Sequence, residues 1–272
     1  MPGSASHAGR RSPRPLDEPR APRVPHDWDG ASYDRVAHPM TRWGTNVLDR
    51  LPLRGDETVL DAGCGSGRVT EQLAARLPDG RVIALDASPS MVQAARERLA
   101  GFGDRVAYAV ADLGRPLPLA VAPVDAILST ATFHWVADHD ALFANLASVL
   151  RPGGRLVAQC GGAGNIGRVL DVLPDSGDGW RGPWTFASPE ETRARLEAAG
   201  FTDIETWLNN ELETFEPGAP FREYLRTVVL GAHLERLPDD ERAPFVDAVA
   251  ARLPDATIDY VRLNILATRG AG

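Results

Sequence analysis

The sequence contains no lysine, so its 29 basic residues are all arginines. This absence excludes enzymes that form a Schiff base on a lysine and phosphate-binding loops that depend on one. Only two cysteines occur, Cys64 and Cys160, far apart and outside any Cys-x-x-Cys spacing. We therefore expect no zinc site, no other metal, no disulfide framework and a reducing, cytoplasmic environment.

Long apolar runs are also missing. No stretch approaches the ~20 residues that span a bilayer, and the N-terminus lacks the apolar core of a signal peptide. The net charge of −8 argues against a partner that is nucleic acid or an anionic membrane. We expect a small-molecule substrate, and the composition leaves the oligomeric state open.

The first 26 residues combine Pro, Ser, Gly and five Arg with almost nothing to bury. We predict that residues 1–26 form a disordered tail, with a basic targeting arm as the alternative. The composition changes at Trp28, and we assign residues 27–272 to one globular domain. An amphipathic helix over Thr41–Leu51 is expected to form an N-terminal cover.

Short apolar runs then alternate with helical patterns. The predicted strands are Thr58–Asp61, Arg81–Asp86, Val106–Val110, Val124–Ser129 and Arg155–Cys160. The predicted helices between them are Arg68–Leu77, Pro89–Leu99 and Asp138–Leu150. Strands that alternate with helices indicate an α/β fold with a parallel sheet.

The second half of the chain is less regular. Asp175–Trp184 is rich in glycine and tryptophan, and we interpret it as a mobile cover. Ser188 and Glu191 form a capping box that opens a helix closed by Gly200. A strand over Thr202–Leu208, helical residues 218–253 and a final, antiparallel strand over Thr257–Thr268 are expected to follow.

A glycine-rich turn joins the first predicted strand to the next helix, in the segment Val59–Gly67. Glycine there lets the backbone approach a bound ligand. A dinucleotide fingerprint would need a third glycine at position 68, which is Arg68. Asp61 would also place negative charge near a pyrophosphate, which disfavours a nicotinamide-dependent oxidoreductase. An acid that only stabilises the turn is the alternative for Asp61.

Acidic residues stand at the ends of three successive predicted strands. Asp61 suits a ligand with an ammonium group, and Asp86 can accept hydrogen bonds from both hydroxyls of a ribose. Asp112 can accept the exocyclic amine of adenine, with Leu113 beside the ring. Together they predict a site for S-adenosylmethionine.

Five segments together resemble class I S-adenosylmethionine-dependent methyltransferases. They are Asp61–Gly67, Leu85–Ser88, the Asp112 step, Val124–Val136 and Leu150–Gly154. The resemblance covers roughly residues 28–269 and implies a Rossmann-like sheet of order 3-2-1-4-5-7-6, with an N-terminal helical cover and a helical insertion before the last strand. Three further segments are similar to the trans-aconitate methyltransferases: Tyr33–Leu51, His134–Phe143 and Phe221–Ile265.

The resemblance also implies the residues that bind the cofactor. Three glycines would contact its methionyl part: Gly63, Gly65 and Gly67. Asp86 would hold the ribose, and Asp112 and Leu113 the adenine. The remaining implied contacts are Ala87 and Met91 at the adenosine, Ala131 on the methionyl side and Tyr33 closing over the cofactor. Core packing is the alternative for Met91.

Three residues are candidates for the acceptor side of the reaction. His134 could deprotonate a substrate hydroxyl or could shape the pocket by hydrogen bonding, and Trp135 would pack or contact substrate. Arg262 could bind a substrate carboxylate through two parallel hydrogen bonds, or could form a structural ion pair. We interpret Cys64 as a small residue that fits the turn. A catalytic nucleophile is disfavoured, since no histidine neighbours it in sequence.

We therefore expect an enzyme that methylates a small molecule, on a carboxylate oxygen of an organic acid. Two alternatives stay open. One is C- or O-methylation of a secondary metabolite such as an isoprenoid, for which Trp135 would supply an aromatic face. The other is a cofactor-binding regulator without activity.

Overall fold

The computed structural model describes residues 38–118, 123–174 and 179–271. The predicted tail over residues 1–26, and Tyr33, lie outside these ranges. Within them, no helix is both long and apolar enough to cross a membrane.

Seven strands form one sheet of order β3-β2-β1-β4-β5-β7-β6, as predicted. They are β1 (Thr58–Ala62), β2 (Arg81–Asp86), β3 (Val106–Val110), β4 (Val124–Thr130), β5 (Leu150–Gly161), β6 (Phe201–Thr214) and β7 (Thr257–Arg269). The first five pair in parallel, and β7 is antiparallel to both β5 and β6, which confirms the expected direction of the last strand.

Helices cover both faces of the sheet. On one face, α2 (His38–Leu48), α3 (Arg68–Ala75) and α4 (Pro89–Arg98) share a core with β1, β2 and β4. On the other, α5 (His139–Val149) and α7 (Pro189–Ala198) enclose a second core. The predicted helix at the N-terminal side of the sheet is confirmed, but it begins and ends three residues earlier than expected.

Side chains cap these helices as the sequence predicts. Ser88 accepts a hydrogen bond from the Met91 amide, and Asp138 accepts one from the Ala141 amide. Ser188 and Glu191 form both hydrogen bonds of the capping box.

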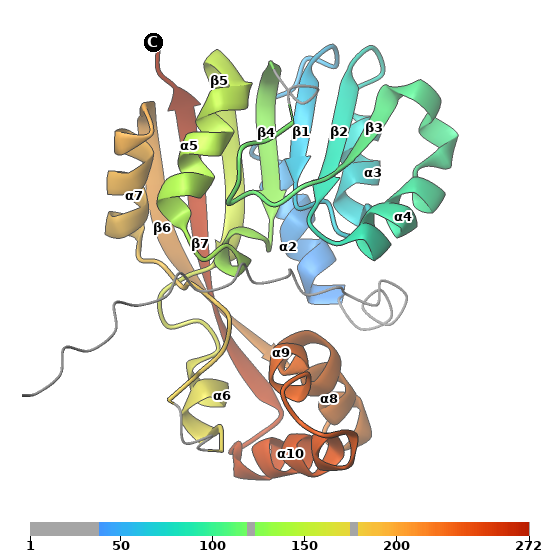
Figure 1. Ribbon diagram of the computed structural model, residues 1–272, viewed down its shortest axis with the longest axis vertical. Coiled ribbons are helices and arrows are strands. Elements are labelled where there is room, and N and C mark those ends of the chain that lie inside the picture. Colours follow the sequence, from blue (N-terminus) through green and yellow to red (C-terminus); the bar gives the residue numbers. More distant parts are fainter. Residues whose placement is uncertain (1–37, 119–122, 175–178, 272) are drawn as a thin grey trace, which may run out of the picture.

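Beyond the sheet, β6 and β7 continue into a second part of the molecule, which we call the helical lobe (Figure 1). It contains α6 (Gly167–Val172), α8 (Ala219–Tyr224), a π-helical turn (Leu225–Val229), α9 (Gly231–Leu234) and α10 (Asp239–Arg252). A third core joins these helices to β7 and, through Trp43, to α2. Residues 218–253 are helical as predicted, apart from a break at 235–238.

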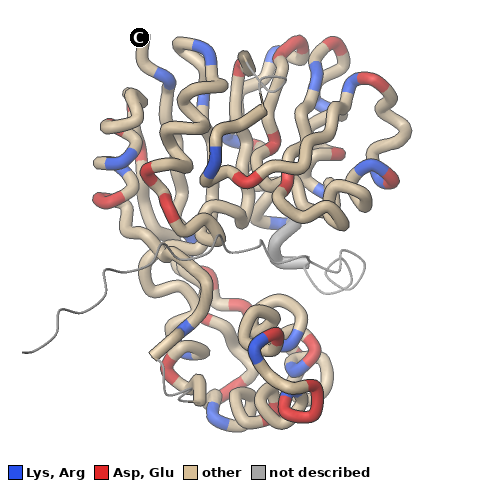
Figure 2. Tube along the Cα trace, in the orientation of Figure 1, with Lys and Arg blue, Asp and Glu red and all other residues tan. Residues whose placement is uncertain are grey.

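Three short elements were not predicted: α6 and the 3₁₀ turns η1 (Ala100–Arg105) and η3 (Phe133–Trp135). Strand β6 is also longer than expected, because β7 pairs with it as far as Thr214 and Thr257. The carboxyl ends of the parallel strands point toward the lobe (Figure 1). Acidic and basic residues are interspersed over both parts of the molecule (Figure 2).

Candidate functional site

The turn after β1 is held against β2 by its backbone. The amides of Gly63 and Cys64 both donate to the Leu85 carbonyl, at 2.8 and 2.9 Å. The turn then passes into α3, whose N-cap is Gly67 in the left-handed region at φ 86°. The strand–turn–helix context predicted for this segment is thus confirmed.

The three glycines of the turn are needed for different reasons. A Cβ on Gly63 would lie 2.1 Å from Oγ1 of Thr132, and a Cβ on Gly67 would lie 3.3 Å from Ala95 of α4. Both therefore permit packing within the protein. Gly65 differs, since its Cβ would meet nothing within 4 Å although its φ is +53°. Of the three, only Gly65 leaves open space around its Cβ position, and the expected contact of all three with the cofactor stays a prediction.

Asp61 is buried at the end of β1, 1% exposed. The Thr70 hydroxyl donates to its Oδ2 at 2.7 Å, while its Oδ1 has no hydrogen-bond partner among the described residues. Burial and, to a smaller extent, the charge of Asp86 raise the pKa of Asp61 to about 7, although the Thr70 hydrogen bond opposes them. A buried carboxylate oxygen without a donor is a place for a cationic group of a ligand.

Asp86 lies beside the same turn, at the end of β2. Its Oδ2 accepts the Gly65 amide and its Oδ1 the Ser88 amide, both at 2.9 Å. A carboxylate has about four acceptor positions, so Asp86 keeps acceptor capacity for a ligand hydroxyl group. Burial raises the pKa of Asp86, and the backbone hydrogen bonds from Ser88, Gly65 and Ala87 lower it.

The other residues predicted for the cofactor surround this edge. Asp112 follows β3, and its Oδ1 accepts the Gly114 amide at 2.8 Å. Leu113 and Met91 are both 4% exposed; Leu113 belongs to the core around α5. Ala131 follows β4 with φ 57°, and its amide donates to the Gln159 carbonyl at 2.7 Å.

His134 lies in the η3 turn after β4 and is 7% exposed. Its Nδ1 accepts the Gly161 amide at 3.2 Å, so the neutral ring carries its proton on Nε2. Burial lowers the pKa of His134 well below its usual value, and Arg262 lowers it further. His134 is therefore a neutral ring that can donate from Nε2, while its only basic nitrogen is occupied by Gly161.

Arg262 lies opposite Gly161 in the pairing of β5 with β7 and is 2% exposed. Its guanidinium lies 4.8 Å from the centre of the Trp43 ring, and its Nε donates to Oε1 of Gln159 at 3.4 Å. The Asn264 side chain accepts from Gln159 at 2.8 Å and donates to the Arg262 carbonyl at 3.1 Å. These contacts fix the arginine on the face of β7 that packs against α2.

Four further side chains with reactive or aromatic groups have partners within the protein or are buried. Burial raises the pKa of Cys64 well above its usual value, which agrees with a residue chosen for fit. Tyr260 bonds to Tyr224 in the lobe at 2.6 Å, and Arg226 forms an exposed ion pair with Glu223. Trp207 lies under the guanidinium of Arg50.

Sequence reasoning missed several residues of this region: Thr70, Gln159, Asn264, Trp184 and Phe186. Gln159 and Asn264 could have been found as polar residues inside strongly apolar strands. A polar side chain is buried at such a position only when it has hydrogen-bond partners. Trp184 and Phe186 gave no usable signal, because only the fold brings them beside His134, where the Phe186 ring stacks at 5.8 Å.

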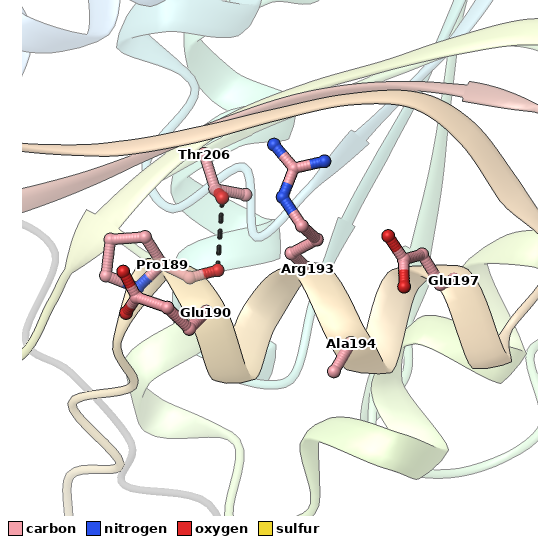
Figure 3. A pocket seen from close by; sticks show the side chains of 6 residues that line it. All are labelled: Pro189, Glu190, Arg193, Ala194, Glu197 and Thr206. Atoms are coloured by element: carbon pink, nitrogen blue, oxygen red, sulfur yellow. Dashed lines mark hydrogen bonds between the residues drawn. The ribbon is translucent and has the colours of Figure 1, made fainter.

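A surface hollow lies along α7, lined by Pro189, Glu190, Arg193, Ala194, Glu197 and Thr206 (Figure 3). It contains none of the predicted site residues. The described residues also include no group of three or more His, Cys, Asp or Glu that could hold a metal ion.

Comparisons with known proteins add to this geometry. A family profile described as "Methyltransferase domain" matches residues 59–154. Trans-aconitate 2-methyltransferase from Methylobacterium radiotolerans is 32% identical over 245 residues, which cover 85% of this chain and 90% of the relative. The residues matched by the family profile run from Val59 of β1 through β4 and include the turn after β1 and His134.

Two solved structures share the fold. Phosphoethanolamine N-methyltransferase 2 from Haemonchus contortus, in complex with phosphomonomethylethanolamine and S-adenosylhomocysteine, has a TM-score of 0.59 at 21% identity. That match covers 89% of this chain but only 57% of the other, so our chain spans little more than half of its length. The YcgJ protein from Bacillus subtilis has a TM-score of 0.60 at 18% identity, covering 85% of this chain and 99% of that one.

Proposed function

Because the chain belongs to the S-adenosylmethionine-dependent methyltransferases, we propose that it transfers the methyl group to a carboxylate oxygen of a small organic acid. The observation that carries the choice of acceptor is the state of His134, a neutral ring whose Nδ1 is occupied by the Gly161 amide. A carboxylate is ionised near neutral pH and needs no base. A hydroxyl or a carbon acid would need one.

The residues at the sheet edge fit the cofactor. The unpartnered Oδ1 of Asp61 suits the ammonium group, the open space at Gly65 suits the methionyl chain, and the remaining acceptor capacity of Asp86 suits the ribose hydroxyls. Gly63 and Gly67 would shape this turn. The adenosine side would be completed by Ala87, Met91, Asp112 and Leu113, and the methionyl side by Ala131. When bound, the cofactor supplies an electrophilic methyl group on a sulfonium sulfur.

The acceptor would be held by Arg262 and His134. Arg262 would donate hydrogen bonds to the carboxylate in its plane, and Nε2–H of His134 would donate to the oxygen that does not react. Trp135 would line the pocket. The remaining carboxylate oxygen would then be free to accept the methyl group that the cofactor would supply. The products are a methyl ester and S-adenosylhomocysteine, and no proton moves. Catalysis then depends on alignment of oxygen, carbon and sulfur.

Two substitutions of His134 test this role, with an organic acid that the wild-type chain methylates as the acceptor. His134→Gln keeps a donor but cannot act as a base, so kcat should stay within about fivefold of the wild type. His134→Phe removes the donor and should lower kcat/KM by about tenfold or more, the cost of one hydrogen bond to a charged group. Equal loss of kcat in both variants, with unchanged cofactor affinity, would make His134 the base and the acceptor a protonated group.

Arg262 is tested in the same assay. Arg262→Lys keeps the charge but loses the paired geometry, so KM for the acid should rise about tenfold while kcat changes less. Arg50→Lys is the matched control, since Arg50 contacts the same Asn264 side chain but lies beside Trp207. An equal effect of both variants would assign Arg262 to structure alone.

A further inference from the structure

A run of contacting rings leads away from His134 into the helical lobe. The ring centres of His134 and Phe186 lie 5.8 Å apart, those of Phe186 and Trp184 5.6 Å, and those of Trp184 and His233 5.7 Å. Trp135 touches the same run, at 5.7 Å from Trp184. We call these five side chains the aromatic series.

The backbone fixes the aromatic series beside the predicted acceptor position. The Thr185 amide donates to the His134 carbonyl at 2.8 Å, and the Ala163 amide donates to the Ala187 carbonyl at 3.0 Å. A Cβ on Gly161 would lie 2.8 Å from the Phe186 ring, so glycine there allows the ring to sit on the end of β5. Three of the rings, Trp135, Trp184 and Phe186, are only partly buried.

Both imidazoles of the aromatic series are uncharged. Burial lowers the pKa of His233 to about 4, against the raising effect of a backbone contact at Arg181, and burial lowers the pKa of His134 as well. The cation that acts on His233 is Arg236, which lowers its pKa further and whose guanidinium lies 4.1 Å from the centre of the Trp180 ring. Four other arginines of the lobe pair with acids: Arg168 with Asp255, Arg222 with Asp247, Arg226 with Glu223 and Arg242 with Asp239. These surroundings suit a flat apolar body better than additional carboxylates.

We propose that the methyl acceptor carries one carboxylate on a flat aromatic or conjugated body, and that this body lies against the rings of Trp184 and Phe186. The proposal rests on the proposed function, since it takes the carboxylate to be held at His134 and Arg262. Ring faces stack on flat π-systems in offset or edge-to-face arrangements, which a saturated ring or a chain with several carboxylates cannot reproduce. Trp184 and Phe186 would then determine specificity.

The test compares three acids with methyl-labelled S-adenosylmethionine and the full chain: trans-cinnamate, its ring-saturated analogue cyclohexanepropionate, and trans-aconitate. We expect kcat/KM for trans-cinnamate to exceed both others by about tenfold. Trp184→Leu and Phe186→Leu should each raise KM for trans-cinnamate about fivefold, with the affinity for S-adenosylhomocysteine unchanged. Trp184→Phe keeps an aromatic ring, so its KM for trans-cinnamate should stay close to that of the wild type. This variant replaces Trp184→Leu in the test if the leucine variant fails to fold.

Phe102→Leu is the matched control, since Phe102 is a partly buried ring at η1, outside the aromatic series. Faster turnover of trans-aconitate or cyclohexanepropionate would overturn the inference and leave ester formation standing. Equal KM changes in Phe102→Leu and Phe186→Leu would also overturn it. Absence of a methyl ester on all three acids and on an extended acid panel would overturn the proposed function, and the inference with it.

Discussion

Asp61 carries an electrostatic cost that a positive ligand would relieve. Its folded pKa of about 7 lies above the value of 3.8 that an unperturbed aspartate has, because the carboxylate is fully buried. Between these values the folded chain holds a proton that the unfolded chain has released. The contribution of Asp61 to stability therefore falls as the pH rises from about 4 to 7.

Asp61→Asn removes this dependence. Without ligand, the melting temperature of the variant relative to the wild type should be higher at pH 8 than at pH 5. Its affinity for S-adenosylhomocysteine should fall, because the amide cannot balance the ammonium group. Thermal scans at the two pH values, with and without the ligand, measure both effects. Asp104→Asn is the exposed control, and a melting-temperature difference independent of pH for Asp61→Asn would contradict the buried-charge argument.

Asp86→Asn should weaken binding of S-adenosylhomocysteine by about tenfold or more, because hydrogen bonds to a charged acceptor contribute about 1.5–3 kcal/mol each. Asparagine keeps the size and one acceptor oxygen for the Gly65 or Ser88 amide. Titration calorimetry gives the affinity. Unchanged affinity would remove Asp86 from the proposed ribose site.

At this scale the sequence predicted the positions of Asp61 and Asp86 at strand ends beside the glycine-rich turn, because strand ends follow from local patterns; their roles toward the cofactor stay predictions. It could not decide between the two roles of His134, since the Gly161 amide that occupies Nδ1 lies 27 positions away. It also could not show that Thr132 and Ala95 pack against Gly63 and Gly67, whose contact with the ligand stays a prediction.

Among the elements, helix caps and parallel strands were the most predictable. Both depend on local patterns: a capping side chain before a proline, or a short apolar run between turns. The length of β6 was not predictable from the sequence. Its last residues pair with β7, about 43 positions later, and they are mostly polar, so no apolar run marks them as a strand. The helical lobe is connected to the sheet by β6 and β7, which extend beyond the other strands (Figure 1).

Ser188→Ala tests the capping box of α7. The variant should lose about 1 kcal/mol of unfolding free energy, since the Glu191 amide loses its acceptor. Ser148→Ala, at the exposed end of α5, is the matched control and should change stability by a few tenths of a kcal/mol. Denaturant unfolding measures both, and equal losses would show that the cap does not stabilise α7.

For the whole molecule, the cores explain how sheet and lobe are joined. Trp43 of α2 packs edge-on against Tyr260 of β7 at 5.0 Å, and its ring also lies under Arg262. The lobe core thus reaches the arginine of the proposed acceptor site. The fold class followed from the alternation of strands and helices, and the strand order followed from the family resemblance. The contact between Trp43 and β7 could not be predicted, because it joins residues more than 200 positions apart.

Removal of residues 1–26 should leave the melting temperature and the affinity for S-adenosylhomocysteine unchanged, because this segment offers little apolar surface to offset its ordering entropy. A second truncation that also removes Tyr33 should weaken ligand binding. Calorimetry of the two truncated chains measures both expectations. A marked drop in melting temperature for the shorter truncation would contradict the first.

The central claim is that a carboxylate oxygen receives the methyl group. Incubation with methyl-labelled S-adenosylmethionine and a panel of organic acids, matched alcohols and isoprenoids, followed by mass spectrometry before and after mild alkali, identifies the methylated atom. The account predicts a labelled ester on an acid, which alkali hydrolyses. A label that survives alkali, on carbon or on an ether oxygen, and formed with no acid in the panel, would contradict it.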